Sequence, residues 1–110
     1  MEKTINIDGQ DIRFVSNGAT MLRYKAIFNR GLFADENALL TKASNNEMDD
    51  DAVEILYMLS YVLAKQGNPE IGTFEEFMER FEILSLLEKA PEIITLLTAS
   101  STPTVTAKKK

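Results

Sequence analysis

Hydrophobic positions crowd together between Asp49 and Gln66, where they point in nearly every direction if the segment is helical. A helix that is apolar all round is a buried helix. Three consecutive aspartates at its start suit the positive end of the helix dipole, and Lys65 followed by Gly67 suits the C-terminal end. We therefore expect this segment to be the central helix against which the rest of the chain packs.

Apolar and polar positions alternate over Lys3–Val15, which is typical of strands and predicts a β-hairpin. A two-residue turn at Asp8-Gly9 would pair Ile5 with Ile12, and a four-residue turn would pair Ile7 with Ile12. Both registers place the apolar residues on one face. A lone hairpin is marginal in water and must pack on the helices. Its edges then either pair with another chain or are protected within the domain.

Two shorter helices are predicted between the hairpin and the central helix. The first covers Met21–Arg30, with Thr20 placed to cap it and Gly31 placed to end it. Its apolar side would consist of Leu22, Tyr24, Ile27 and Phe28. The second covers Leu32–Lys42, and three of its residues would point inward, namely Phe33, Leu39 and Leu40.

Helical periodicity returns after the break at Gly67-Asn68-Pro69. Thr73 and Glu76 have the spacing of a capping box, which predicts a helix starting near Phe74. Residues 83–89 continue the helical pattern, and Pro91 should open a last helix that ends near Ala99, so that it separates two helices or kinks one. The composition then changes to a polar tail without apolar period, which predicts disorder.

The length of 110 residues supports one domain with a modest core. We expect an α+β fold, mostly α, in which the N-terminal hairpin packs on a bundle of about five helices. The domain would span residues 1–98, followed by a disordered tail over residues 99–110. No apolar run approaches the roughly 20 residues of a membrane span. We therefore expect a soluble, cytosolic protein.

The chain has no histidine and no cysteine, so the usual general base, thiol nucleophile and transition-metal ligands are missing. The run Asp49–Asp51 lacks the spacing of an EF-hand loop and is better explained by helix capping. The glycines are isolated, which argues against a phosphate-binding loop. These observations predict no catalytic residue, no metal site and no cofactor, and therefore no enzyme.

The formal net charge of −5 argues against nucleic acid as the main partner. One alternative is a small regulator that contacts nucleic acid through Arg13, Arg23, Lys25 and Arg30, although cations on a short helix are usually a solvated face. The apolar side chains after residue 70 exceed what a minimal domain needs to cover one helix. Some of them are therefore candidates for binding a partner helix or a sister subunit: Phe74, Phe77, Phe81, Leu87, Ile94 and Leu97.

Four segments carry a resemblance to a known family. They read IDGQDIRF in the hairpin, TMLRYKAIFNRGLF from Thr20 to Phe33, YVLAKQGNPEI from Tyr61 to Ile71, and FEEFMERFEI from Phe74 to Ile83. Together they span about residues 4–97, and they resemble the tail assembly chaperones of long-tailed phages and prophages of Gram-positive bacteria. The alternative within phage biology is a structural tail or neck component of the virion.

The resemblance implies a non-enzymatic factor that keeps the long tape measure protein soluble while the tail tube polymerises around it. It further implies that the protein acts in the cytoplasm of the bacterial host, is absent from the mature virion, and forms a homo-oligomer. In that family a programmed frameshift often appends a second domain to a minority of the product. The three terminal lysines, Lys108–Lys110, are compatible with a slippery adenine-rich codon run and equally with a solubilising tail.

Overall fold

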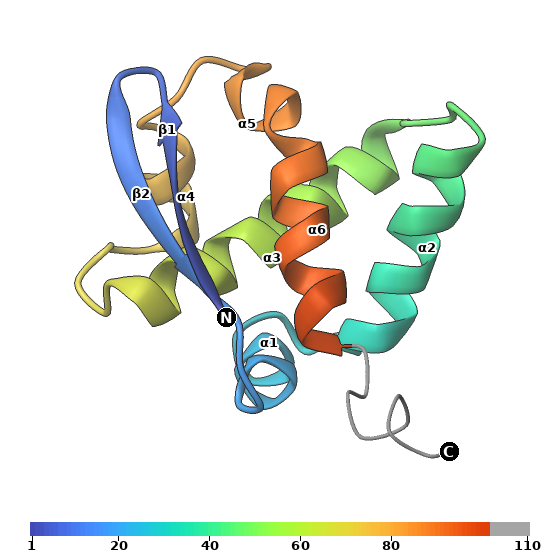
Figure 1. Ribbon diagram of the computed structural model, residues 1–110, viewed down its shortest axis with the longest axis horizontal. Coiled ribbons are helices and arrows are strands. Elements are labelled where there is room, and N and C mark those ends of the chain that lie inside the picture. Colours follow the sequence, from blue (N-terminus) through green and yellow to red (C-terminus); the bar gives the residue numbers. More distant parts are fainter. Residues whose placement is uncertain (102–110) are drawn as a thin grey trace, which may run out of the picture.

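The computed structural model describes residues 1–101, with side chains described through Ala99. A two-stranded antiparallel hairpin is followed by six helices (Figure 1). The predicted α+β fold, mostly α, is confirmed. In chain order the elements are β1 (Glu2–Ile7), β2 (Gln10–Val15), α1 (Thr20–Phe28), α2 (Leu32–Ser44), α3 (Asp50–Gly67), α4 (Phe74–Met78), α5 (Ser85–Glu88) and α6 (Ala90–Ser101).

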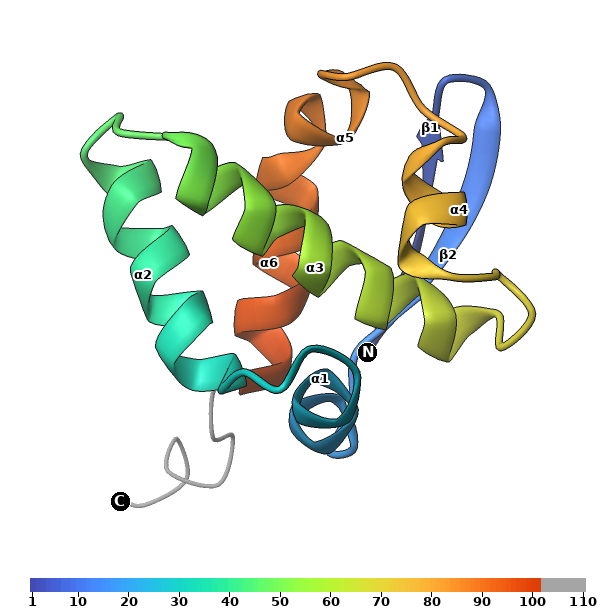
Figure 2. The same cartoon turned by 180° about the vertical axis from the view of Figure 1, so that it is seen from behind.

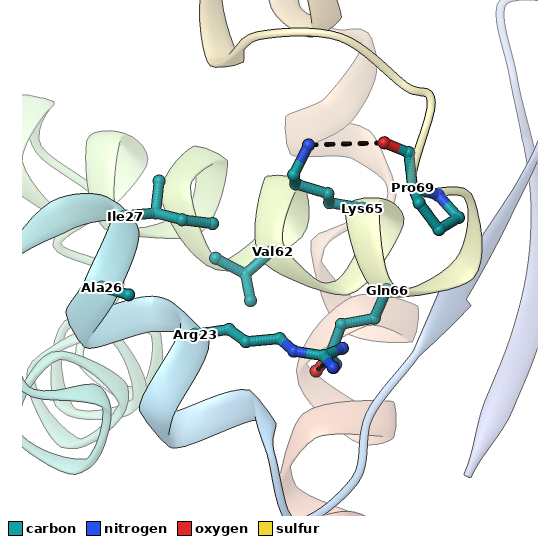
Figure 3. Close-up of a pocket in the computed structure, with 7 residues that line it drawn as sticks. All are labelled: Arg23, Ala26, Ile27, Val62, Lys65, Gln66 and Pro69. Carbon is teal, nitrogen blue, oxygen red and sulfur yellow. Dashed lines mark hydrogen bonds between the residues drawn. The ribbon is translucent and has the colours of Figure 1, made fainter.

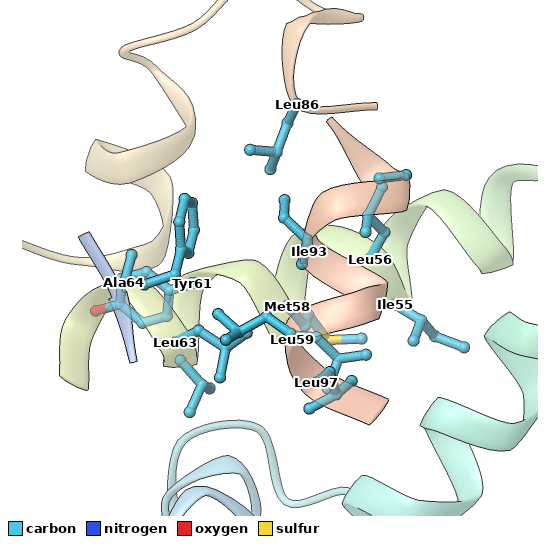
Figure 4. Packing of buried hydrophobic residues seen from close by; sticks show 14 of the residues in the cluster. Ile55, Leu56, Met58, Leu59, Tyr61, Leu63, Ala64, Leu86, Ile93 and Leu97 are labelled. Atoms are coloured by element: carbon cyan, nitrogen blue, oxygen red, sulfur yellow. The ribbon is translucent and has the colours of Figure 1, made fainter. Parts of the chain in front are cut away.

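Helix α3 is the centre of the domain, as its all-round apolar pattern predicts. It contacts β2, α1, α2, α4 and α5, and ten of its residues are buried. Figures 1 and 2 both place α2 on one side of α3 and the hairpin with α4 on the other. Figure 4 shows side chains of α3 packed near Leu86, Ile93 and Leu97 from the C-terminal helices. The start of α3 is fixed by Asp49, whose side chain accepts a hydrogen bond from the Ala52 amide at 3.0 Å.

The hairpin adopts the shorter of the two predicted turns. Ile5 pairs with Ile12 and Ile7 with Gln10, so that only Asp8 and Gly9 lie between the strands. Both turn residues have left-handed backbones, with φ of 54° and 82°, which is the geometry of a type I′ turn and explains the glycine. The inner face is buried against the helices through Ile5, Ile7, Ile12 and Phe14.

The β2 strand crosses α3 at Gly67, and this contact revises the predicted role of that glycine. We expected Gly67 to end the helix, a role that glycine usually fills with a left-handed backbone, but Gly67 is the last residue inside α3 and does not have a positive φ. A Cβ atom there would lie 2.0 Å from the carbonyl oxygen of Arg13. Gln66 donates to the Val15 carbonyl at 2.7 Å beside this contact. The glycine is therefore needed for the close approach of strand and helix.

Several predictions for α1 and α2 are wrong. Thr20 is the first residue inside α1 and does not cap it; its hydroxyl accepts from the Asn17 amide and from Gln66. Helix α1 ends at the left-handed Asn29 before reaching Gly31. Three residues that were expected to face inward are exposed instead: Leu22 at 65%, Ile27 at 40% and Phe33 at 58%.

The inward face of this region is set by a polar contact that periodicity does not reveal. Tyr24 is fully buried, and its hydroxyl donates to Asp35 at 2.5 Å. This bond joins α1 to α2 and places Leu32, instead of Phe33, in the core. Leu39 is buried and Leu40 is half-buried, as expected.

The C-terminal part begins with the predicted capping box, since Thr73 accepts from the Glu76 amide and Glu76 accepts from the Thr73 amide. The expected continuation of the helical pattern is interrupted, because α4 ends at Met78 and the chain turns over residues 79–84. The hairpin turn stabilises this break: Asp8 accepts from the Glu82 amide at 2.9 Å and from the Ser85 hydroxyl at 2.6 Å.

Pro91 is the second residue of α6 and separates it from α5, as predicted. Helix α6 runs through Ser101, so the boundary expected near residue 98 lies inside a helix. Residues 102–110, on which the rest of the tail prediction falls, lie outside the described part of the chain.

Candidate protein-binding surface

The acidic run at the start of α3 performs the capping role that we expected. Asp49 caps the helix and also forms an ion pair with Lys42. Hydrogen bonds from Lys42 and from the Ala52 amide hold the pKa of Asp49 below its usual value. Within residues 1–101, no group of three or more acidic side chains is arranged to hold a metal ion. No helix of the same stretch is long and apolar enough to cross a membrane.

The buried polar cluster of the domain is a clamp between α1 and α2. Asp35 accepts from the Tyr24 hydroxyl and forms a two-point ion pair with Arg30, at 2.6 Å and 3.0 Å. The Arg30 guanidinium lowers the pKa of Asp35, whereas burial raises the pKa of Tyr24. Tyr24 and Asp35 are buried and bonded to each other, and the exposed Arg30 neutralises the Asp35 carboxylate, so the cluster stabilises the fold and fixes the orientation of α1.

The six apolar residues predicted to bind a partner fall into two groups. Phe77 and Leu97 are buried in the core, at 0% and 2% exposure, so a partner cannot reach them in the folded domain. The other four are half-buried against the core: Phe74, Phe81, Leu87 and Ile94. Phe74 borders a hollow of ≈ 310 Å³ whose other lining residues are Glu75, Met78 and Glu79. The structure therefore does not gather the six into one exposed surface.

A different apolar surface is exposed on α1 and at the start of α2. Met21 is 41% exposed, and Leu22, Ile27 and Phe33 are the residues whose inward orientation proved wrong. We call these four side chains, with the cations between them, the α1 surface. At about 100° per residue, Leu22 and Ala26 lie opposite the buried Tyr24, while Met21 and Ile27 lie on the two flanks. Helix α1 thus forms a ridge on which apolar side chains alternate with Arg23 and Lys25.

A hollow lies on each side of this ridge. The first lies between α1 and α3 and measures ≈ 360 Å³ (Figure 3). Its lining consists of Arg23, Ala26, Ile27, Val62, Lys65, Gln66 and Pro69. The second measures ≈ 300 Å³ and lies where α1 meets α2. Its lining consists of Met21, Leu22, Lys25, Arg30, Gly31, Leu32, Phe33 and Ala34. Concave apolar hollows beside exposed cations suit the side chains of another protein.

Two of the four cations of the alternative nucleic-acid interface are paired with carboxylates. Arg13 pairs with Glu2 at 2.5 Å on the hairpin, and Arg30 pairs with Asp35. Arg23 instead donates to the neutral side chain of Gln66 at 3.2 Å. These two ion pairs reduce the positive charge that this alternative interface would offer to a phosphate backbone.

Comparisons of the chain with protein-family models, with curated proteins and with solved structures find no match. The candidate surface accordingly rests on the geometry of the domain. Sequence reasoning missed it because it assigned Leu22, Ile27 and Phe33 to the core. The available signal was the interleaving of these residues with Arg23 and Lys25, since a helix face that mixes cations and large apolar residues is poorly suited to a core.

Proposed function

We propose that this chain is a tail assembly chaperone of a long-tailed phage or prophage, which binds the tape measure protein and keeps it soluble while the tail tube polymerises around it. The observation that carries the proposal is the α1 surface, where four large apolar side chains are exposed beside two hollows. The resemblance of residues 4–97 to tail assembly chaperones suggests the tape measure protein as the partner. Exposed apolar patches that are rimmed by polar residues mark interaction sites.

The physical task matches this surface. A tape measure chain is long and helical, and its apolar stripes aggregate unless they are covered before assembly. The α1 surface offers a helix ridge with a hollow on either side, and packing an amphipathic helix against such grooves is a common mode of recognition. The core is complete around α3 without these side chains, so the domain can present them without unfolding.

Several further expectations follow from the same proposal. The protein acts in the cytoplasm of the bacterial host and leaves before the virion is complete. It works as a homo-oligomer, in which several copies cover one client, and a frameshift-extended version of itself joins them. No enzymatic step is part of this function.

Co-expression with the tape measure protein tests the proposal. We expect the wild-type chain to keep the client in the soluble fraction and to co-purify with it. The double variant Leu22→Ser with Phe33→Ser should lose most of this effect, because it removes the two most exposed apolar side chains of the α1 surface. Ile83→Ser is the matched control, since Ile83 is 81% exposed on the turn between α4 and α5, at the opposite end of the molecule (Figures 1 and 2).

Two results would contradict the proposal. One is a client that stays insoluble beside the wild-type chain, with no complex recovered. The other is mass spectrometry of purified virions that finds the chain at stoichiometric amounts, which would make it a structural tail or neck component.

A further inference from the structure

The hollow between α1 and α3 combines an apolar floor with two cations. Val62 is almost fully buried at its base, and Ala26 and Ile27 extend the apolar lining along α1. Arg23 from α1 and Lys65 from α3 lie on opposite sides of Val62 (Figure 3). An apolar side chain entering the hollow would therefore have a positive charge on either side.

Neither cation is neutralised within residues 1–101. Arg23 donates to the amide oxygen of Gln66, and Lys65 donates to the Pro69 carbonyl at 3.5 Å while its ammonium lies 5.9 Å from the centre of the Tyr61 ring. All of these partners are uncharged. By contrast, Arg30 and Lys42 both pair with carboxylates. In a chain with a net charge of −5, two unpaired cations around one apolar hollow are a specific feature.

We propose that this hollow selects an apolar side chain of a partner helix that carries carboxylates one turn before and one turn after it. Residues four apart lie on the same face of a helix, so such carboxylates flank the apolar anchor and reach the two cations. The volume of ≈ 360 Å³ accommodates a leucine or phenylalanine side chain. This inference rests on the proposed function and specifies which client segments the chaperone recognises.

The electrostatic part of this recognition has a measurable signature. Both cations are at the rim of an open hollow, so salt screens their attraction for carboxylates over about 8 Å at 0.15 M. Rim charges act on the association rate and on specificity among partners. Binding of an acid-flanked helix should therefore weaken as salt rises, whereas the apolar contribution from the floor should persist.

A synthetic helical peptide tests this selectivity. The probe carries one leucine anchor, with glutamates four residues before and after it, and a second peptide carries glutamines there. Fluorescence anisotropy should give about fivefold tighter binding of the glutamate peptide in 50 mM salt, which is the order expected of two solvent-exposed ion pairs. Arg23→Glu should abolish this preference, because one negative and one positive charge would then flank the hollow.

Two further variants control the measurement. Lys65→Gln should reduce the preference without reversing it. Lys89→Glu makes the same change of charge at the junction of α5 and α6, which lies away from α1 in both views (Figures 1 and 2), and it should leave the preference within about twofold because salt screens distant charges. Circular dichroism and thermal unfolding verify that each variant is folded, and Arg23→Gln replaces Arg23→Glu if the reversed charge disturbs the helix.

Equal binding of the glutamate and glutamine peptides would overturn the inference. Displacement of the peptide by duplex DNA would also overturn it, because the occupant of the hollow would then be a nucleic acid. Light scattering in which Arg23→Glu dissociates an oligomer of the chain would overturn it as well, because the occupant would then be a second copy. A different result would contradict the proposed function alone: the wild-type chain prefers the glutamate peptide but leaves the tape measure protein insoluble. If the wild-type chain solubilises the client and Arg23→Glu does so equally well, only the inference fails.

Discussion

Replacing Gly67 by alanine is a stringent test of how β2 sits on α3. In an isolated helix this change is favourable by about 1 kcal/mol, because glycine is a poor helix former. In the folded domain the new Cβ atom would lie 2.0 Å from the carbonyl oxygen of Arg13. A carbon atom and a carbonyl oxygen normally stay at least about 3.3 Å apart. Strand and helix must therefore separate by more than an ångström.

The expected cost can be assembled from three terms. Overpacking of this kind costs about 1–3 kcal/mol. The movement also disrupts two hydrogen bonds, from Gln66 to the Val15 carbonyl and from Arg13 to the Gly67 carbonyl, each with a net value of about 1 kcal/mol. After subtraction of the gain in helix propensity, Gly67→Ala should destabilise the domain by about 2–4 kcal/mol. This is a large part of the ~5–15 kcal/mol that holds a typical domain together.

Urea unfolding followed by circular dichroism measures this free energy. Gly18→Ala is the matched control, since no atom lies within 4 Å of a Cβ built there and its φ is not left-handed. That variant should be unchanged or more stable by up to about 1 kcal/mol. If Gly67→Ala is as stable as Gly18→Ala, the strand does not approach the helix at this glycine and the reasoning is refuted.

Three further predictions concern the core, the clamp and the binding surface. Phe77→Ala should cost about 3–5 kcal/mol in urea unfolding, because the ring is fully buried beside its aromatic neighbours. Asp35→Asn should cost about 1.5–3 kcal/mol at pH 7. Arg30 lowers the pKa of Asp35 in the folded state, so the stability that the Asp35 carboxylate provides is complete above about pH 4 and disappears as the pH falls through the lowered pKa. Urea unfolding of the wild-type chain and of Asp35→Asn between pH 2 and 7 measures this loss. Leu22→Ser should change the free energy of unfolding by less than about 0.5 kcal/mol, since the side chain is exposed. Any loss of partner binding by this variant should therefore occur without a loss of stability.

The candidate site was less predictable from the sequence than the fold. Helical spacing correctly showed that Phe74 and Phe77 share a face, but it could not distinguish a face that packs on α3 from one that meets a partner. The same limitation affected Ile27, which has helical spacing with the buried Tyr24 and is nevertheless exposed. Burial depends on how neighbouring elements are oriented, and the bond between Tyr24 and Asp35 that orients α1 joins residues with no recognisable motif.

What the sequence determined by itself is the set of features that depend on near neighbours along the chain. The hairpin, the cap of α3 at Asp49 and the capping box of α4 each involve groups close together along the chain, so they can be recognised from the sequence. The length of the hairpin turn was left open between two residues and four. The all-round apolar character of α3 likewise made it central wherever the other elements were placed.

Tertiary structure decided the features that depend on contacts between distant segments. The end of α4 depends on the hairpin turn, more than seventy residues away, whose Asp8 binds the backbone at Glu82. The need for glycine at position 67 depends on a strand that crosses it, and the hollow with Arg23 and Lys65 exists only because α1 and α3 lie side by side. Local periodicity records which residues share a face, whereas the packing of all elements together determines what that face meets.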